Sequence, residues 1–126
     1  MLIAARKDMS VVFGMREQPE RLIRNMKEKF KNNVIVLTVG SEGAFANDGR
    51  IYFRKVPGVH EIDRIGAGDA FAAGFIFGYL KTDIEAALAY GTALAALKCT
   101  IPGDIPYVTR DDVEGFIKGM DKDIER

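Results

Sequence analysis

One short stretch of the sequence combines two glycines, a carboxylate and the start of an apolar helix. Gly66 and Gly68 come just before Asp69, and mostly apolar residues follow directly over 70–80. The first turn of a helix presents free backbone N–H groups, and glycine lets a ligand approach that backbone closely because it has no Cβ. The pattern predicts an anion site, most often for a phosphate. A carboxylate there repels the anion unless it has a chemical task, and for Asp69 we expect removal of a proton from a hydroxyl that attacks phosphorus.

A purely structural interpretation of this stretch stays open on the bare pattern. An aspartate in the first turn of a helix interacts favourably with the helix dipole without any further function. The stretch also differs from two familiar phosphate motifs. Phe71 stands where Gly-x-Gly-x-x-Gly requires its third glycine, and the Gly-Lys-Ser/Thr ending of a P-loop is missing.

The longer pattern over residues 63–74, D-x-x-G-A-G-D-A-F-x-x-G, resembles the second signature of the ribokinase (PfkB) family of carbohydrate kinases. Segments 39–45 and 98–104 are most similar to the 2-keto-3-deoxygluconate kinases of that family. The resemblance implies phosphoryl transfer from ATP, with Mg²⁺, to a sugar hydroxyl. It implies that Asp69 is the general base. It also implies that the backbone amides of Gly66, Ala67 and Gly68 form the anion hole.

The resemblance implies further nucleotide contacts outside this motif. Segment 38–43 would line the phosphates and ribose, and the loop from 100 to 103 would lie beside the adenine. From the residues alone, the glycines of segment 38–43 could equally serve only to shape a turn. The nucleotide-binding residues predicted in this way are Thr38, Gly40, Ser41, Glu42, Gly43, Gly68, Thr100 and Gly103.

Two metal positions also follow from the resemblance. Asp63 would brace its loop and help to hold a monovalent cation together with carbonyl oxygens of the loop that begins at Thr100, although Arg64 replaces the commoner threonine. An Asn-x-x-Glu motif that helps to organise Mg²⁺ in the family falls on Ala5 and Asp8. Asp8 can reach a metal through water. Ala5 has no side-chain hydrogen-bonding group, so we expect a damaged magnesium site.

Composition narrows the function class. Of the 126 residues, 18 are Lys or Arg and 18 are Asp or Glu, so no net charge favours nucleic acid or a membrane as partner. Cys99 is the only cysteine, which predicts a buried thiol and no disulfide framework. No apolar stretch reaches transmembrane length, so we expect a cytoplasmic protein.

Length suggests one domain over residues 1–126, equivalent to the C-terminal, nucleotide-binding part of a ribokinase-like kinase. Members of that family are roughly twice as long, and their N-terminal half carries the sugar-binding residues and a small lid. We therefore expect weak nucleotide binding and little or no turnover from this chain, with sugar bound only if the missing half is supplied. The alternative is a non-enzymatic remnant or subunit that forms a homo-oligomer or pairs with a partner chain, because a truncated sheet exposes a strand edge and apolar faces.

Hydrophobic periodicity and turn residues predict an α/β fold, a partial ribokinase-like fold whose mostly parallel sheet carries a β-hairpin and packed helices. Gly74 and Gly78, four residues apart, predict a helix face that another element approaches closely. A capping box beginning at Thr82 predicts the start of the next helix. The expected strands are 2–5, 34–39, 44–46 and 51–53, and the expected helices are 6–13, 19–31, 68–80, 82–99 and 113–120.

Overall fold

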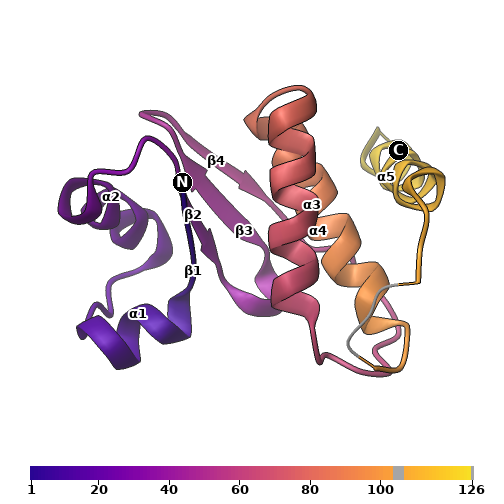
Figure 1. The fold of residues 1–126 in the computed structure, drawn as a ribbon, viewed down its shortest axis with the longest axis horizontal. Helices are drawn as coiled ribbons and strands as arrows, with labels where there is room; N and C mark the ends of the chain where they lie inside the picture. The colour runs from indigo at the N-terminus through magenta and orange to yellow at the C-terminus, as the bar shows by residue number, and fades with distance from the viewer. Residues whose placement is uncertain (104–106, 126) are drawn as a thin grey trace. The chain divides into compact units, whose positions relative to one another are not determined.

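The computed structural model describes residues 1–103 and 107–125, with side chains as far as residue 121. The chain divides into two compact units, Met1–Lys55 and Val56–Arg126. Each unit has its own architecture, coloured indigo to magenta and magenta to yellow respectively in Figure 1.

The first unit is a four-stranded sheet with strand order β1-β2-β3-β4. Only the first pair is parallel, and the two following pairs are antiparallel, so the expectation of a mostly parallel sheet is wrong for the described strands. The physical reason is connection length. A parallel crossover needs a dozen or more residues, and only the β1–β2 connection, which contains both helices of the unit, is that long. The elements are β1 (Leu2–Ala5), α1 (Arg6–Phe13), α2 (Pro19–Phe30), β2 (Ile35–Thr38), β3 (Ala44–Asn47) and β4 (Ile51–Arg54).

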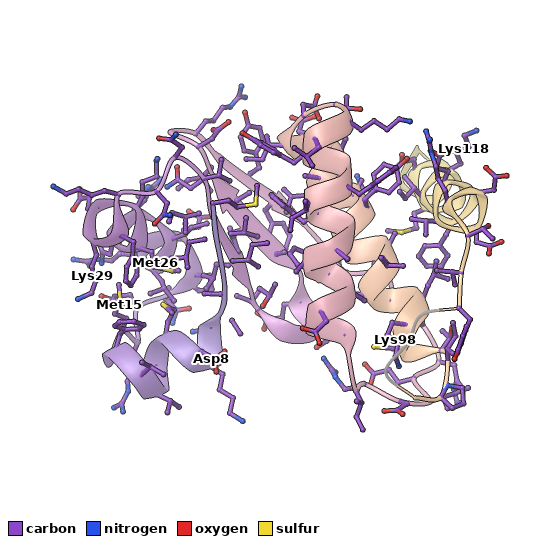
Figure 2. All side chains as sticks on the ribbon, in the orientation of Figure 1. Asp8, Met15, Met26, Lys29, Lys98 and Lys118 are labelled. Atoms are coloured by element: carbon purple, nitrogen blue, oxygen red, sulfur yellow. The ribbon has the colours of Figure 1, made fainter. Side chains whose placement is uncertain are left out.

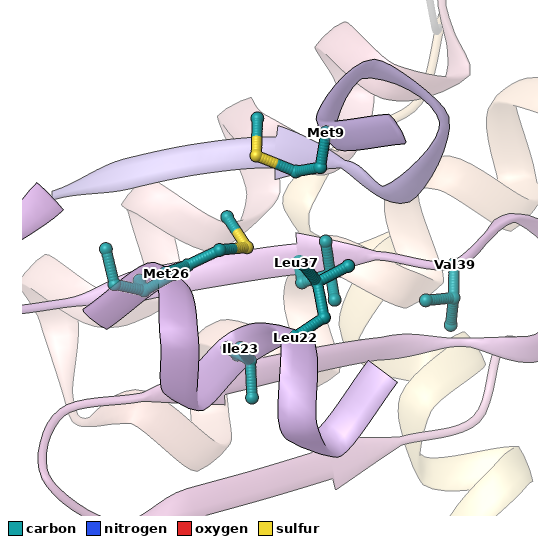
Figure 3. Packing of buried hydrophobic residues seen from close by; sticks show 7 residues of the cluster. Met9, Leu22, Ile23, Met26, Leu37 and Val39 are labelled. Carbon is teal, nitrogen blue, oxygen red and sulfur yellow. The ribbon is translucent and has the colours of Figure 1, made fainter. Parts of the chain in front are cut away.

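Helix α2 covers one face of this sheet, and its apolar stripe forms the centre of the core (Figure 3). Leu22, Ile23 and Met26 recur at helical spacing and are completely buried. They pack with Ile35 and Leu37, which point to the same face because they are two residues apart on β2. Full burial of each such side chain stabilises the fold by about 1.5–3 kcal/mol. Helix α2 and the sheet are therefore the stable base of this unit.

The second unit is helical and contains α3 (Ala67–Lys81), α4 (Ile84–Cys99) and α5 (Arg110–Glu125). Helices α3 and α4 lie side by side (Figure 1) at very close range. A Cβ added at Gly74 would lie 2.6 Å from the Tyr90 carbonyl oxygen, and one at Gly78 would lie 2.7 Å from that of Ala86. The predicted glycine face is confirmed. This contact fixes α3, the helix that carries the sequence motif, against α4.

The ends of α5 and α4 differ from the predicted bounds. Thr109 and Asp112 exchange hydrogen bonds at the start of α5, which begins at Arg110, before the predicted residue 113, and continues beyond residue 120. Helix α4 is capped by Asp83, whose carboxylate accepts from the Ala86 amide at 2.8 Å, so the capping box predicted from Thr82 is wrong. Thr82 instead closes α3, donating its N–H to the Gly78 carbonyl. Among the described residues, no helix is long and apolar enough to cross a bilayer.

Candidate active site

The side-chain carboxylate and the backbone amide of Asp63 both form hydrogen bonds that hold the loop before α3. Its carboxylate accepts hydrogen bonds from the Ile65 amide at 2.9 Å and from the Gly103 amide at 3.0 Å. These backbone donors, of which the Ile65 amide has the larger effect, hold the pKa of the Asp63 carboxyl below its ordinary value. The Asp63 amide donates in turn to the Cys99 carbonyl at 3.0 Å. The loop before α3 is thus attached to the loop that follows α4.

Helix α3 begins with a glycine in a left-handed conformation. Gly66 has φ 84° at the N-cap, and its carbonyl accepts from the Ala70 amide at 2.9 Å. The Ala67 amide donates to the Arg64 carbonyl at 3.1 Å, so one of the three amides predicted for the anion hole already has an acceptor. The Gly68 and Asp69 amides have no acceptor in the part of the chain that the structure describes. The helix start therefore presents these two donors.

The described residues leave open space beside the backbone at Gly68. A Cβ built there meets none of their atoms within 4 Å, so packing against the described part of the chain does not require glycine at this position. The Asp69 side chain, one residue further on, is exposed in the first turn. The neighbouring Arg64 guanidinium is paired with Glu61 at 2.9 Å. An open backbone and an exposed carboxylate thus occupy one helical turn.

The predicted nucleotide segment of the first unit follows β2. Thr38 ends that strand, and Gly40–Glu42 form a 3₁₀ turn with exposed side chains. Gly43 is a different case, because it has φ 144° and a Cβ there would lie 2.4 Å from the Arg54 carbonyl oxygen. Its glycine is required by the neighbouring strand β4. The turn interpretation therefore accounts for the glycine at this position, and the nucleotide contact expected at Gly43 stays a prediction.

Asp8, the predicted magnesium residue, lies in the first turn of α1 and is exposed. Figure 2 labels it on α1, the helix that follows β1. The register pairs Ala5 with Thr38, so the carboxyl ends of β1 and β2 bring α1 and the 3₁₀ turn to the same edge of the sheet. Ala5 is the N-cap of α1 and makes no side-chain capping bond. Within the described residues, no three His, Cys, Asp or Glu side chains gather closely enough to hold a metal ion.

Lys98 belongs to none of the sites predicted from the sequence. This side chain, labelled at the end of α4 in Figure 2, is 0% exposed. Its ammonium donates to the carbonyl oxygens of Ile101, at 2.9 Å, and Asp63, at 3.3 Å. Its charge could have indicated it in the sequence, because Lys98 and Glu85 are the only charged residues of the mostly apolar α4.

The predicted residues fall into one group in each unit. Thr38, Gly40–Gly43 and Asp8 belong to the first unit, and Asp63, Gly66–Asp69, Thr100 and Gly103 to the second. Thr100 has its hydroxyl engaged, since it donates to the Leu97 carbonyl at 2.6 Å. Asp104, the last residue of the segment similar to 2-keto-3-deoxygluconate kinases, lies outside the described residues.

The proteins that this chain resembles are carbohydrate kinases. Residues 1–110 match the model of the pfkB family carbohydrate kinases. The chain is 37% identical over 128 aligned positions to a 2-dehydro-3-deoxygalactonokinase of Haloferax volcanii. The alignment covers 100% of this chain and 40% of that protein. The chain thus spans about two fifths of the length of this relative.

Solved structures share the fold. The 2-dehydro-3-deoxygluconokinase of Thermotoga maritima superposes with a TM-score of 0.83 at 24% identity, over 94% of this chain and 41% of that one. A ribokinase-like protein from E. coli, solved in complex with ATP and Mg²⁺, gives a TM-score of 0.80 at 24% identity, over 94% of this chain and 39% of that one. The family match over residues 1–110 shows that this chain belongs to the pfkB family of carbohydrate kinases.

Proposed function

We propose that this chain is the nucleotide-binding part of a sugar kinase that transfers a phosphoryl group from ATP to a hydroxyl of a 2-keto-3-deoxy sugar acid. Family membership and the names of its relatives support the reaction and the substrate class. The observation that carries the proposal is the start of α3, where the free Gly68 and Asp69 amides, the open space at Gly68 and the exposed Asp69 carboxylate share one turn.

Each group at this turn has a role in the proposed chemistry. The Asp69 carboxylate accepts the proton of the attacking sugar hydroxyl, which contributes typically about 10²–10⁴-fold in rate. The free amides donate to oxygens of the transferred phosphoryl group, and the positive end of the α3 dipole stabilises its negative charge. We assign the anion hole to Gly66, Ala67 and Gly68, as the resemblance implies, and add the Asp69 amide. The Gly68 and Asp69 amides are its best-prepared donors, because the Ala67 amide already has an acceptor.

The remaining nucleotide contacts are proposed from both units. In the first unit we assign phosphate and ribose contacts to Thr38 and the segment Gly40–Gly43, and in the second we assign adenine contacts to Thr100 and Gly103. Magnesium, when bound, neutralises phosphate charge, and Asp8 is the carboxylate of this chain that would hold it through water. A single exposed carboxylate fits Mg²⁺, which usually keeps several waters and is bound by one or two carboxylates together with substrate phosphates.

We expect the 126-residue chain alone to bind Mg-ATP weakly and to turn over little or no sugar. Correct placement of the hydroxyl is worth more than the general base, about 7–11 kcal/mol in favourable cases, and the corresponding contacts of the relatives belong to proteins more than twice as long. Activity would then require the remainder of such a kinase on the same or a second polypeptide.

A second candidate is a non-enzymatic subunit that associates with itself or with a partner chain. The observation that favours it is an apolar surface on α3, where Leu80 is 80% exposed, Ile76 44% and Phe77 41%. Ala5 also favours this candidate, because it stands where the resemblance implies an asparagine that helps to organise Mg²⁺. Well-folded oligomers without nucleotide affinity at millimolar ATP would favour this candidate over the kinase.

Calorimetric titration of the chain with Mg-ATP, with its mass in solution determined alongside, tests the proposal. We expect saturable binding that Asp69→Asn preserves, together with loss of any phosphotransfer in that variant. Asp111→Asn is the matched control, because it removes an exposed first-turn carboxylate from another helix, α5, and should change neither property. Phosphotransfer at an unchanged rate in Asp69→Asn would remove Asp69 from its proposed role.

A further inference from the structure

A fully buried ammonium lies where the loops on either side of the motif helix meet. Lys98 is 0% exposed, and its Nζ donates to the Ile101 carbonyl at 2.9 Å and the Asp63 carbonyl at 3.3 Å. Burying an ammonium is costly unless its donors are satisfied, and lysine has three donors and no acceptor. The two backbone carbonyls satisfy two of the three donors of this buried ammonium inside the second unit.

These oxygens are the type of donor that a monovalent cation requires. Backbone carbonyls can replace the hydration shell of an alkali cation, and hard cations prefer oxygen ligands. The sequence resemblance implies such a cation at Asp63, with carbonyls of the loop that begins at Thr100. In this chain the carbonyls of Asp63 and Ile101 are both used by Lys98, and the Asp63 carboxylate accepts from the Ile65 and Gly103 amides. The donor set does not fit a free ion.

We propose that the Lys98 ammonium takes the place of a monovalent cation at this junction, so that the loop leading to Gly66–Asp69 is held by a charge attached to α4 and independent of ions in solution. Lys98 is then a positioning residue. It acts through Asp63, which stands at the start of the motif loop.

Attachment to the chain has two physical consequences. A tethered ammonium is present at its site at a fixed effective concentration, whereas occupancy by a free ion follows the ion concentration. Lys98 also lies in the last turn of α4, where the negative end of the helix dipole favours a cation. The junction is therefore insensitive to the choice of alkali ion.

Thermal unfolding in matched salts tests the inference without nucleotide or sugar, so its failure is separate from failure of the proposed kinase. The midpoint of the unmodified chain should be the same in KCl, NaCl and tetramethylammonium chloride at equal ionic strength. A saturable rise of that midpoint with KCl, absent with tetramethylammonium, would overturn the proposal. An anomalous rubidium peak at the Asp63 and Ile101 carbonyls, in crystals of the unmodified chain soaked in RbCl, would also overturn the proposal.

Lys98→Met sharpens the test by removing the charge and leaving the carbonyl oxygens without a cation. We expect a lower midpoint that KCl raises saturably while tetramethylammonium chloride does not. The matched control is Lys81→Met, which removes an exposed lysine from the last turn of α3 and should show no potassium dependence. A Lys98→Met midpoint equal to that of the unmodified chain would show that the ammonium does not hold the loops.

Discussion

Two glycine-containing turns of this chain look alike in sequence and differ in what their glycines do. In the first unit, Gly43 has φ 144°, and its missing Cβ leaves room for the Arg54 carbonyl, which a methyl group would approach to 2.4 Å. In the second unit, Gly68 is part of helix α3, and a methyl group there would meet no atom of the described residues within 4 Å. Packing among these residues requires the first glycine and does not require the second.

This difference separates a structural glycine from a candidate binding glycine. Glycine in a helix is destabilising relative to alanine by roughly 0.5–1 kcal/mol, so an unexplained glycine in a first turn has a cost that packing does not offset. Access of a ligand to the Gly68 amide would offset it. The same reasoning gives the glycine at position 43 a structural explanation, so the side-chain contacts proposed for the 38–43 segment depend on its exposed residues.

The largest effect is expected for Gly43→Ala. The new methyl group would collide with backbone that cannot move aside easily, in a conformation that favours glycine, so the free energy of unfolding should fall by about 3 kcal/mol. Urea unfolding followed by circular dichroism measures this loss. A change below 0.5 kcal/mol, as is common at exposed surface positions, would mean that the β4 contact at Gly43 does not constrain the turn.

Gly68→Ala is the same substitution at the contrasting position. The free energy of unfolding should stay the same or rise by up to about 1 kcal/mol, because alanine favours helix and its methyl group meets no described atom within 4 Å. Mg-ATP affinity should fall roughly ten-fold, equivalent to about 1.4 kcal/mol, because the methyl group shields the amide. Gly68→Val should lower the affinity further. Undiminished affinity in both variants would remove Gly68 from the anion hole and end the distinction between the two turns.

Glu42→Ala tests whether the turn of the first unit contributes to binding through exposed side chains. Its removal should weaken Mg-ATP binding several-fold, in calorimetry, and change the free energy of unfolding by less than about 0.5 kcal/mol. Glu28→Ala, which removes an exposed glutamate from α2, is the matched control and should change neither. If both variants bind equally well, the 38–43 segment has only the structural role that Gly43 shows.

The smallest effect is expected for the stability of the second unit at acid pH, which depends on Asp63 in the loop before α3. The amides of Ile65 and Gly103 lower the pKa of Asp63, so its contribution to stability is complete above the ordinary pKa of aspartate and is lost as pH falls through the lowered value. The unfolding midpoint should therefore drop on acidification in that window, and less so in Asp63→Asn. Equal acid profiles for the two proteins would show that this carboxylate does not hold the motif loop.

Local chemistry explains why much of the fold could be predicted. Pro19, Gly14 and the apolar spacing of α2 act within a few residues, and the structure places α1 and α2 within one residue of the predicted ends. Two predictions were wrong: which of two adjacent residues caps α4, and whether most strands pair in parallel. Thr82 and Asp83 are both good capping residues, and the direction of strand pairing depends on which strand returns to which edge.

By itself, the sequence determined the family and the position of the motif, because an anion site at a helix start is built from consecutive residues, Gly66 to Asp69. Tertiary structure alone decided which glycine is explained by packing, since Gly43 meets Arg54 on the neighbouring strand. It also decided the partners of Lys98, since the Asp63 carbonyl is 35 residues away along the chain. Contacts between residues far apart in sequence depend on how the elements pack, and no local pattern of residue types specifies them.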